Sequence, residues 1–173
     1  MEFVNQLGQG CVRIYNGKMA KSAAQSLLNE IWGDRGLPVD PAWIASRLGI
    51  VVKLASLPEK VSGAIIKDAG CDPVILLAQN DSNNRQRFTC AHELGHYVSN
   101  QGSGTFEYVD LRNGSSNPEE TWANEFAGNL LMPERLVREM AARNDPAIVM
   151  SWRFGVSMDA MSIRLKRLGI PVE

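Results

Sequence analysis

The chain has 173 residues, of which 45% are hydrophobic and 21% charged, with a net charge of -1. It is long and apolar enough for one domain with its own core, and its charge excludes a strongly basic nucleic-acid binder and an acidic disordered chain. The three cysteines are too widely spaced for a disulfide framework, and neither a secretory signal nor a membrane-spanning run is visible. We therefore expect a cytoplasmic protein.

The first half of the chain predicts two helices and three strands after an N-terminal extension over residues 1–17. Residues 18–33 place apolar side chains at helical spacing and end at a glycine, which predicts an amphipathic helix. A second helix is predicted from Asp40, a favourable N-cap that is followed by Pro41. Three short runs favour a small three-stranded sheet, namely Val51–Leu54, Gly63–Lys67 and Val74–Leu77.

The only two histidines of the chain, His92 and His96, lie in the motif His-Glu-x-x-His. Asn83 and Asn84 offer a polar N-cap for a helix over this segment. On a helix, residues four apart project from the same face, so the two imidazoles can share one metal ion. Glu93 is then close enough to act on a water at that ion, which is the arrangement of zinc metallopeptidases. The alternative is a pair of surface histidines without a ligand.

A third protein ligand has to be a carboxylate or a thiolate, because no other histidine remains. Cys90 is two residues from His92 and therefore projects from the wrong side of the same helix. Residues 118–133 predict a further helix, because they begin and end with a proline. Asn117 or Ser116 is expected to cap it.

Glu120 lies on one side of the helix predicted over residues 118–133, along a stripe that is expected to face the core. The stripe consists of small and apolar residues with one asparagine: Ala123, Asn124, Ala127, Leu130 and Leu131. A buried carboxylate needs a partner, which a metal ion supplies, with Glu119 as the alternative ligand. Without a metal, the helix dipole would also stabilise a negative charge at the N-terminus of this helix, on Glu119 as well as on Glu120. Glu125 and Asn129 point toward solvent, and small residues that include Gly128 would allow close packing on the histidine helix.

The last third of the chain predicts a loop and a helical hairpin. Residues 99–118 are polar and glycine-rich, which indicates a loop or flap over the site. Residues 146–169 have helix-turn-helix rhythm, with a turn at Gly155. Five of their apolar residues favour a packed scaffold over a DNA-reading hairpin: Met158, Met161, Ile163, Leu165 and Leu168.

The chain resembles the ImmA/IrrE family of metallopeptidases. The match is carried by residues 85–96, Arg-Gln-Arg-Phe-Thr-Cys-Ala-His-Glu-Leu-Gly-His, and by residues 120–127, Glu-Thr-Trp-Ala-Asn-Glu-Phe-Ala. It continues through Leu-Leu-Met-Pro at 130–133 and extends over residues 20–170. Two mild departures, Cys90 and Gly128, replace the leucine and alanine usual in the family.

The resemblance implies an α+β zincin-like domain over residues 18–173, with the His-Glu-x-x-His helix at its centre. His92, His96 and Glu120 would bind zinc, or manganese as a second choice, and Glu93 would be the catalytic base. The implied protein is a zinc-dependent endopeptidase that cleaves a regulatory protein held in extended form on an edge strand. In the family that substrate is typically a helix-turn-helix repressor of a prophage, mobile element or stress response, here a separately encoded one.

Two points stay open at the level of the sequence. The oxyanion-stabilising group can be named only by residue type, as Tyr97, Tyr108 or Arg112. A non-proteolytic antitoxin or anti-repressor that uses the same fold is the alternative function. Neither direct DNA binding nor membrane association is expected.

Overall fold

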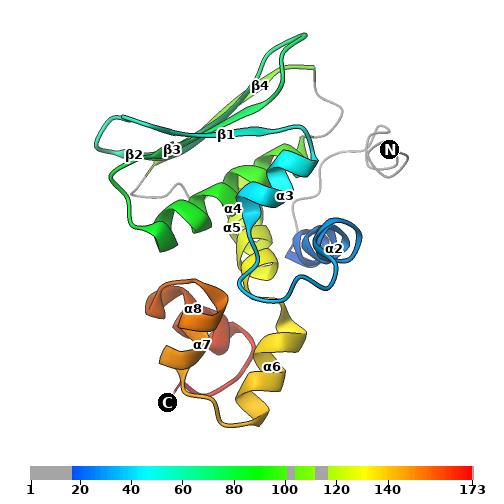
Figure 1. Ribbon diagram of the computed structural model, residues 1–173, viewed down its shortest axis with the longest axis vertical. Helices are drawn as coiled ribbons and strands as arrows, with labels where there is room; N and C mark the ends of the chain where they lie inside the picture. Colours follow the sequence, from blue (N-terminus) through cyan, green and yellow to red (C-terminus); the bar gives the residue numbers. More distant parts are fainter. Residues whose placement is uncertain (1–16, 101–103, 112–116, 173) are drawn as a thin grey trace.

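A four-stranded sheet forms one end of the molecule, and the described helices all lie to one side of it (Figure 1). The computed structural model describes residues 17–100, 104–111 and 117–172. The sheet has the order β1-β3-β2-β4, in which β1 runs parallel to β3 and the other neighbours are antiparallel. Its strands are β1 (Val51–Ala55), β2 (Val61–Lys67), β3 (Val74–Ala78) and β4 (Phe106–Leu111). The predicted α+β class is therefore confirmed.

Strand β4 corrects two expectations, the three-stranded sheet and the loop over residues 99–118. It pairs with β2, with Tyr108 opposite Ile65 and Asp110 opposite Gly63. Both faces of β4 mix apolar and polar side chains, so no alternation marks it as a strand in the sequence. Other parts of the predicted loop, residues 101–103 and 112–116, lie outside the described residues.

The N-terminal helix, α2 (Gly17–Leu27), continues into a π-helical turn, η1 (Leu28–Trp32). It ends at Gly33, whose φ of 62° explains the glycine there. The predicted extent is confirmed. The helical spacing predicts a packed face with Met19, Ala23, Leu27 and Ile31. Leu27 is buried as expected, but Met19 is 51% exposed, and the other buried residues are Ala20, Ala24 and Leu28. The predicted extension lies outside the described residues except for Gly17.

Helix α3 (Pro41–Arg47) begins as predicted, because the Asp40 carboxylate accepts hydrogen bonds from the backbone N–H groups of Ala42 and Trp43. Helix α4 (Asn83–Ser99) is capped by Ser82 instead of Asn83 or Asn84. The serine ends the preceding turn in extended backbone, and its hydroxyl accepts from the N–H of Arg85.

Helix α5 (Pro118–Leu131) is capped by Asn117, as predicted, and packs against α4 beneath the sheet. A Cβ atom added at Gly95 of α4 would stand 3.1 Å from Phe126 Cδ1 and 3.2 Å from Ala123 Cα. A glycine is therefore needed where the two helices approach. Gly128 has no such role, because a Cβ atom there would meet nothing within 4 Å.

Three further helices form the other end of the molecule (Figure 1): α6 (Glu134–Ala142), α7 (Ala147–Phe154) and α8 (Met158–Arg167). Helix α6 is not among the predicted elements. Gly155 makes the predicted turn between α7 and α8 in the left-handed conformation. Met161 and Leu165 are buried as expected, whereas Met158 and Ile163 are 37% and 53% exposed.

A buried arginine, Arg164 of α8, overturns the expectation that Asn129 faces solvent. Its guanidinium donates to the carbonyl of Met132 at 3.1 Å and to Asn129 Oδ1 at 2.9 Å. Asn129 is consequently only 7% exposed. Arg167, which is half exposed, is ion-paired with Glu125, so two of the basic side chains of the hairpin have partners within this chain.

Candidate metal centre

Helices α4 and α5 bring the three predicted ligands together. His92 Nε2 lies 3.1 Å from Glu120 Oε2, and His96 Nε2 lies 3.2 Å from Glu120 Oε1. The two Nε2 atoms are 3.1 Å apart. Among the described residues, this trio is the group of ligand side chains that could hold a metal ion, and the alternative, Glu119, does not belong to it.

The geometry of this trio fits a small cation. The side chains of the two histidines are almost fully buried, and that of Glu120 is 13% exposed. Two nitrogens bound tetrahedrally to one zinc ion lie about 3.4 Å apart, close to the separation seen here. Two nitrogens and a carboxylate also leave a coordination position open, which is typical of catalytic zinc sites.

Asn124 supports the first histidine and is the site residue that sequence reasoning missed. Its Oδ1 atom lies 3.1 Å from His92 Nδ1. If Nδ1 carries the proton that this oxygen accepts, Nε2 is left with its lone pair directed at Glu120 and His96. The available signal was its position four residues after Glu120 on the same stripe of α5.

Strand β4 supports the second histidine. The ring of Tyr108 stacks on His96, with centroids 4.3 Å apart and an interplanar angle of 9°. The Tyr108 hydroxyl donates to Asn100 Oδ1 at 3.3 Å, and Asn100 in turn donates to the carbonyl of His96. Tyr108 therefore contacts the centre through its ring, with its hydroxyl already engaged.

The other two candidates for an oxyanion donor gain no support from the structure. Tyr97 packs beside Phe106, and the ammonium of Lys67 lies 5.9 Å from the centroid of the Tyr97 ring. Burial raises the pKa of the Tyr97 phenol. Arg112 lies outside the described residues.

Glu93 is fully buried, and neither of its carboxylate oxygens has a hydrogen-bond partner within the described part of the chain. Burial raises the pKa of Glu93 well above its ordinary value, and the negative charges of Asp110 and Glu120 raise it further. Gly63 of β2 lies beside this carboxylate, since a Cβ atom there would be 3.4 Å from Glu93 Oε1. Such an uncompensated carboxylate is costly unless a cation or a proton accompanies it.

Two other charged groups complete the surroundings of the centre. Asp110 lies 3.6 Å from Arg85 Nη2, and Arg85 also donates to Ser62 Oγ at 2.8 Å. Burial raises the pKa of Asp110, while the charges of His92 and Arg85 oppose this shift. At Glu120 burial acts in the same direction, but hydrogen bonds to both histidines lower its pKa to about 2.

A helix with buried His-Glu-x-x-His, a carboxylate from a second helix and a small mixed sheet above them define a zincin-like metallopeptidase domain. The chain belongs to the peptidase family described as the IrrE N-terminal-like domain, whose model matches residues 45–166. The resemblance seen in the sequence is thereby confirmed.

Other comparisons add the fold alone. A solved structure described as a Mycobacterium tuberculosis transcriptional regulator is similar, with a TM-score of 0.57 and 20% sequence identity. The match covers 86% of this chain but 46% of that one, so the chain spans less than half of its length. Comparison with curated proteins gives no match. Among the described residues, no helix is both long and apolar enough to cross a membrane.

Proposed function

We propose that the protein is a zinc-dependent endopeptidase that cleaves a specific regulatory protein, with residues 18–173 acting as one catalytic domain. The observation that carries the proposal is the convergence of His92, His96 and Glu120 next to the buried carboxylate of Glu93, which lacks a described protein partner. Membership of a peptidase family supports it. A binding protein would need the three ligands at most, and would have no use for Glu93.

In this proposal His92, His96 and Glu120 hold the metal, for which zinc is the first choice and manganese the second. The bound cation would polarise the scissile carbonyl and lower the pKa of the attacking water. Glu93 accepts the proton of that water and returns it to the leaving amine. Burial suits Glu93 to this task, because a carboxylate with a raised pKa is a stronger base.

Strand β4 offers a place for the substrate. It is an edge strand, and its Tyr108 lies against His96, so the free edge runs past the metal centre. An extended peptide could pair with this edge through its backbone and pass the ligands. An extended segment of a protein is therefore the substrate class we propose, and the resemblance favours a separately encoded helix-turn-helix repressor.

The test uses the purified full chain, zinc and the repressor encoded beside its gene. We expect the wild type to cut the repressor, and Glu93→Gln to bind zinc with an unchanged Kd while cleavage falls by at least about a hundredfold. Glu120→Gln should lose zinc binding as well as cleavage. Calorimetry and mass spectrometry of the products measure the two effects.

Equal cleavage, or none, by the wild type and Glu93→Gln would contradict the proposal. If repressor activity is relieved equally by wild type and Glu93→Gln without cleavage, the antitoxin or anti-repressor alternative holds. DNA binding is disfavoured because Arg164 of the hairpin is buried and Arg167 is ion-paired with Glu125. A salt-sensitive gel shift with DNA would reverse that judgement.

A further inference from the structure

The face of the sheet that points away from the helices, called here the outer face, is largely apolar. The register places its side chains in two rows that cross all four strands. The first row is Val51, Val74, Ile66 and Glu107, and the second is Lys53, Leu76, Ala64 and Val109. The alternate positions, such as Ile65 and Ile75, are fully buried against the helices.

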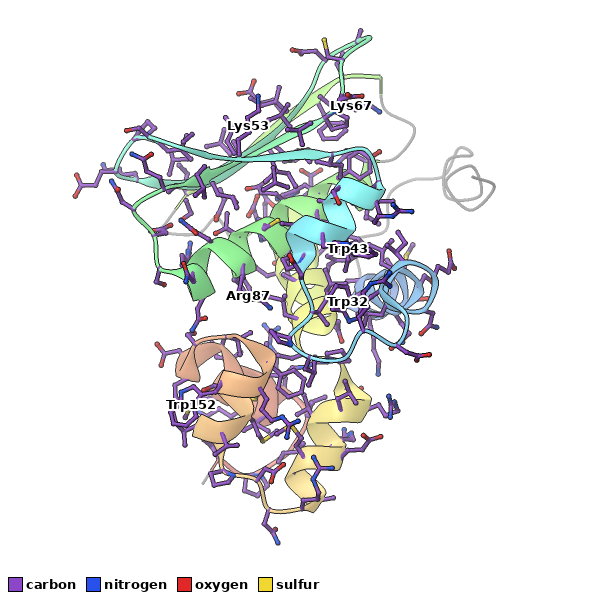
Figure 2. All side chains as sticks on the ribbon, viewed as in Figure 1. Trp32, Trp43, Lys53, Lys67, Arg87 and Trp152 are labelled. Atoms are coloured by element: carbon purple, nitrogen blue, oxygen red, sulfur yellow. The ribbon has the colours of Figure 1, made fainter. Side chains whose placement is uncertain are left out.

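No described helix covers the outer face (Figure 1). Val51 and Val109 are 39% and 45% exposed, although the solvated face of such a sheet is normally polar. Six of the eight residues are apolar, and the two that are charged are both exposed. Figure 2 shows Lys53 directed away from the helices. Exposed apolar patches of this kind are typical of surfaces that contact another molecule.

The charges of Lys53 and Glu107 indicate which kind of surface can pack against the outer face. Lys53 lies on edge strand β1 in the second row, and Glu107 lies on the opposite edge strand, β4, in the first row. Neither is ion-paired with another described residue. The outer face therefore carries one positive and one negative edge with an apolar centre, a pattern that can complement itself.

A two-fold axis parallel to the strands stacks two outer faces so that β1 of one copy lies over β4 of the other. This brings each Lys53 to the edge that carries Glu107 of the second copy, one row away. One row is about 6.8 Å along a strand, and stacked sheets lie about 10 Å apart, which two long side chains can bridge. An axis across the strands would instead place β1 over β1 and oppose the two lysines.

We propose that the outer face is a dimer interface, in which two copies of this chain stack their sheets around a two-fold axis parallel to the strands. The apolar centres of the two faces exclude water, and two Lys53–Glu107 pairs at the edges set the orientation. The metal centre lies on the opposite face of the sheet, so the inference does not depend on the proposed function.

The test is a charge exchange in the full chain. The wild type should show a dimer in sedimentation equilibrium at micromolar concentration. Lys53→Glu and Glu107→Lys should each raise the dimer Kd on the order of tenfold or more, because each places like charges at both edges. The double variant Lys53→Glu/Glu107→Lys should recover to within about threefold of the wild type, because it restores both pairs with reversed signs.

Lys166→Glu, at an exposed position of helix α8, is the matched control and should leave the dimer Kd unchanged. Circular dichroism checks that each variant folds, which is expected since both altered residues are exposed. The proposal is overturned if the wild type is still a monomer at about 100 μM, because the dimer Kd would then be weaker than that concentration. It is overturned equally if the two single effects simply add in the double variant. In either case the outer face is not a contact between two copies of this chain.

Discussion

At the scale of single residues, Gly63 is a point of close approach between strand β2 and helix α4. A Cβ atom at Gly63 would stand 2.4 Å from Thr89 Cγ2 and 2.9 Å from the carbonyl oxygen of Leu76. The missing side chain therefore allows α4 to hold Glu93 against β2. Both the stability of the fold and the position of the proposed base depend on this contact.

We expect Gly63→Ala to lower the free energy of unfolding by about 1–3 kcal/mol, because α4 or β2 has to shift. Its cleavage rate should fall more than its zinc affinity, since the three atoms nearest to the added methyl group include a carboxylate oxygen of Glu93 but no atom of His92 or His96. Urea unfolding, zinc titration and peptide cleavage measure the three quantities. Gly128→Ala is the control, because open space surrounds that position and alanine favours the helix by up to about 1 kcal/mol. Equal stability of the two variants would contradict the role of Gly63.

The three residues of the candidate metal centre could be picked out from the sequence because each argument needs only one helix. His92 and His96 follow from their spacing, and Glu120 from the small and apolar stripe of α5. The same reasoning gave a wrong prediction for Asn129. The side chain that covers it, Arg164, comes from a helix far along the chain. Helical position indicates which way a side chain points but not what meets it there.

At the scale of elements, Arg164 fastens α8 to the C-terminal end of α5. Its guanidinium is surrounded by the carbonyl of Met132 and the amide of Asn129, and burial lowers the pKa of Arg164. The contact joins the C-terminal helices to the helix that supplies Glu120. The charge is kept because its hydrogen bonds compensate for the loss of water.

Arg164→Met should destabilise the protein by about 2–4 kcal/mol, because it keeps the apolar stem but leaves two buried acceptors unpaired. Thermal and urea unfolding measure this loss. Arg153→Met removes an exposed charge from the same hairpin and should change stability by less than about 0.5 kcal/mol. If both variants unfold alike, the buried contact does not hold the hairpin in place.

The elements that could be predicted are those whose patterns are local. Asp40 with Pro41, and Asn117 with Pro118, mark the starts of their helices through their own chemistry. Strand β4 could not be predicted, because Asp110 faces inward while Val109 faces outward and the alternation is lost. Its assignment depends on pairing with β2, which a local pattern does not contain.

At the scale of the whole molecule, α4 connects regions that are far apart in the chain. Arg87, near the start of α4, donates to the carbonyl of Val39 before α3 and to the carbonyl of Gly155 in the hairpin turn. Figure 2 shows Arg87 below α4, on the side of the C-terminal helices. The proposed metal would add a second connection, because its ligands come from both α4 and α5.

Zinc should therefore stabilise the folded protein as a whole. At a free concentration one hundred times its Kd, zinc should add about 2.7 kcal/mol to the free energy of unfolding, because the unfolded chain does not hold the three ligands together. Differential scanning calorimetry with zinc and after chelation measures the shift in Tm. Glu120→Gln should lose most of the shift, whereas Glu93→Gln should keep it. A Tm that chelation leaves unchanged in the zinc-loaded wild type would contradict the site.

The stacking of Tyr108 on His96 has a kinetic consequence. Strand β4 is an edge strand whose partner on β2 lies far away in the chain, so it is expected to open locally before the other strands do. Each opening would lift the Tyr108 ring from His96 and admit water to the centre from that side. The residence time of a bound ion would then be set by how often strand β4 opens. In that case the backbone amides of β4 would exchange with solvent at the same rate as the metal is released.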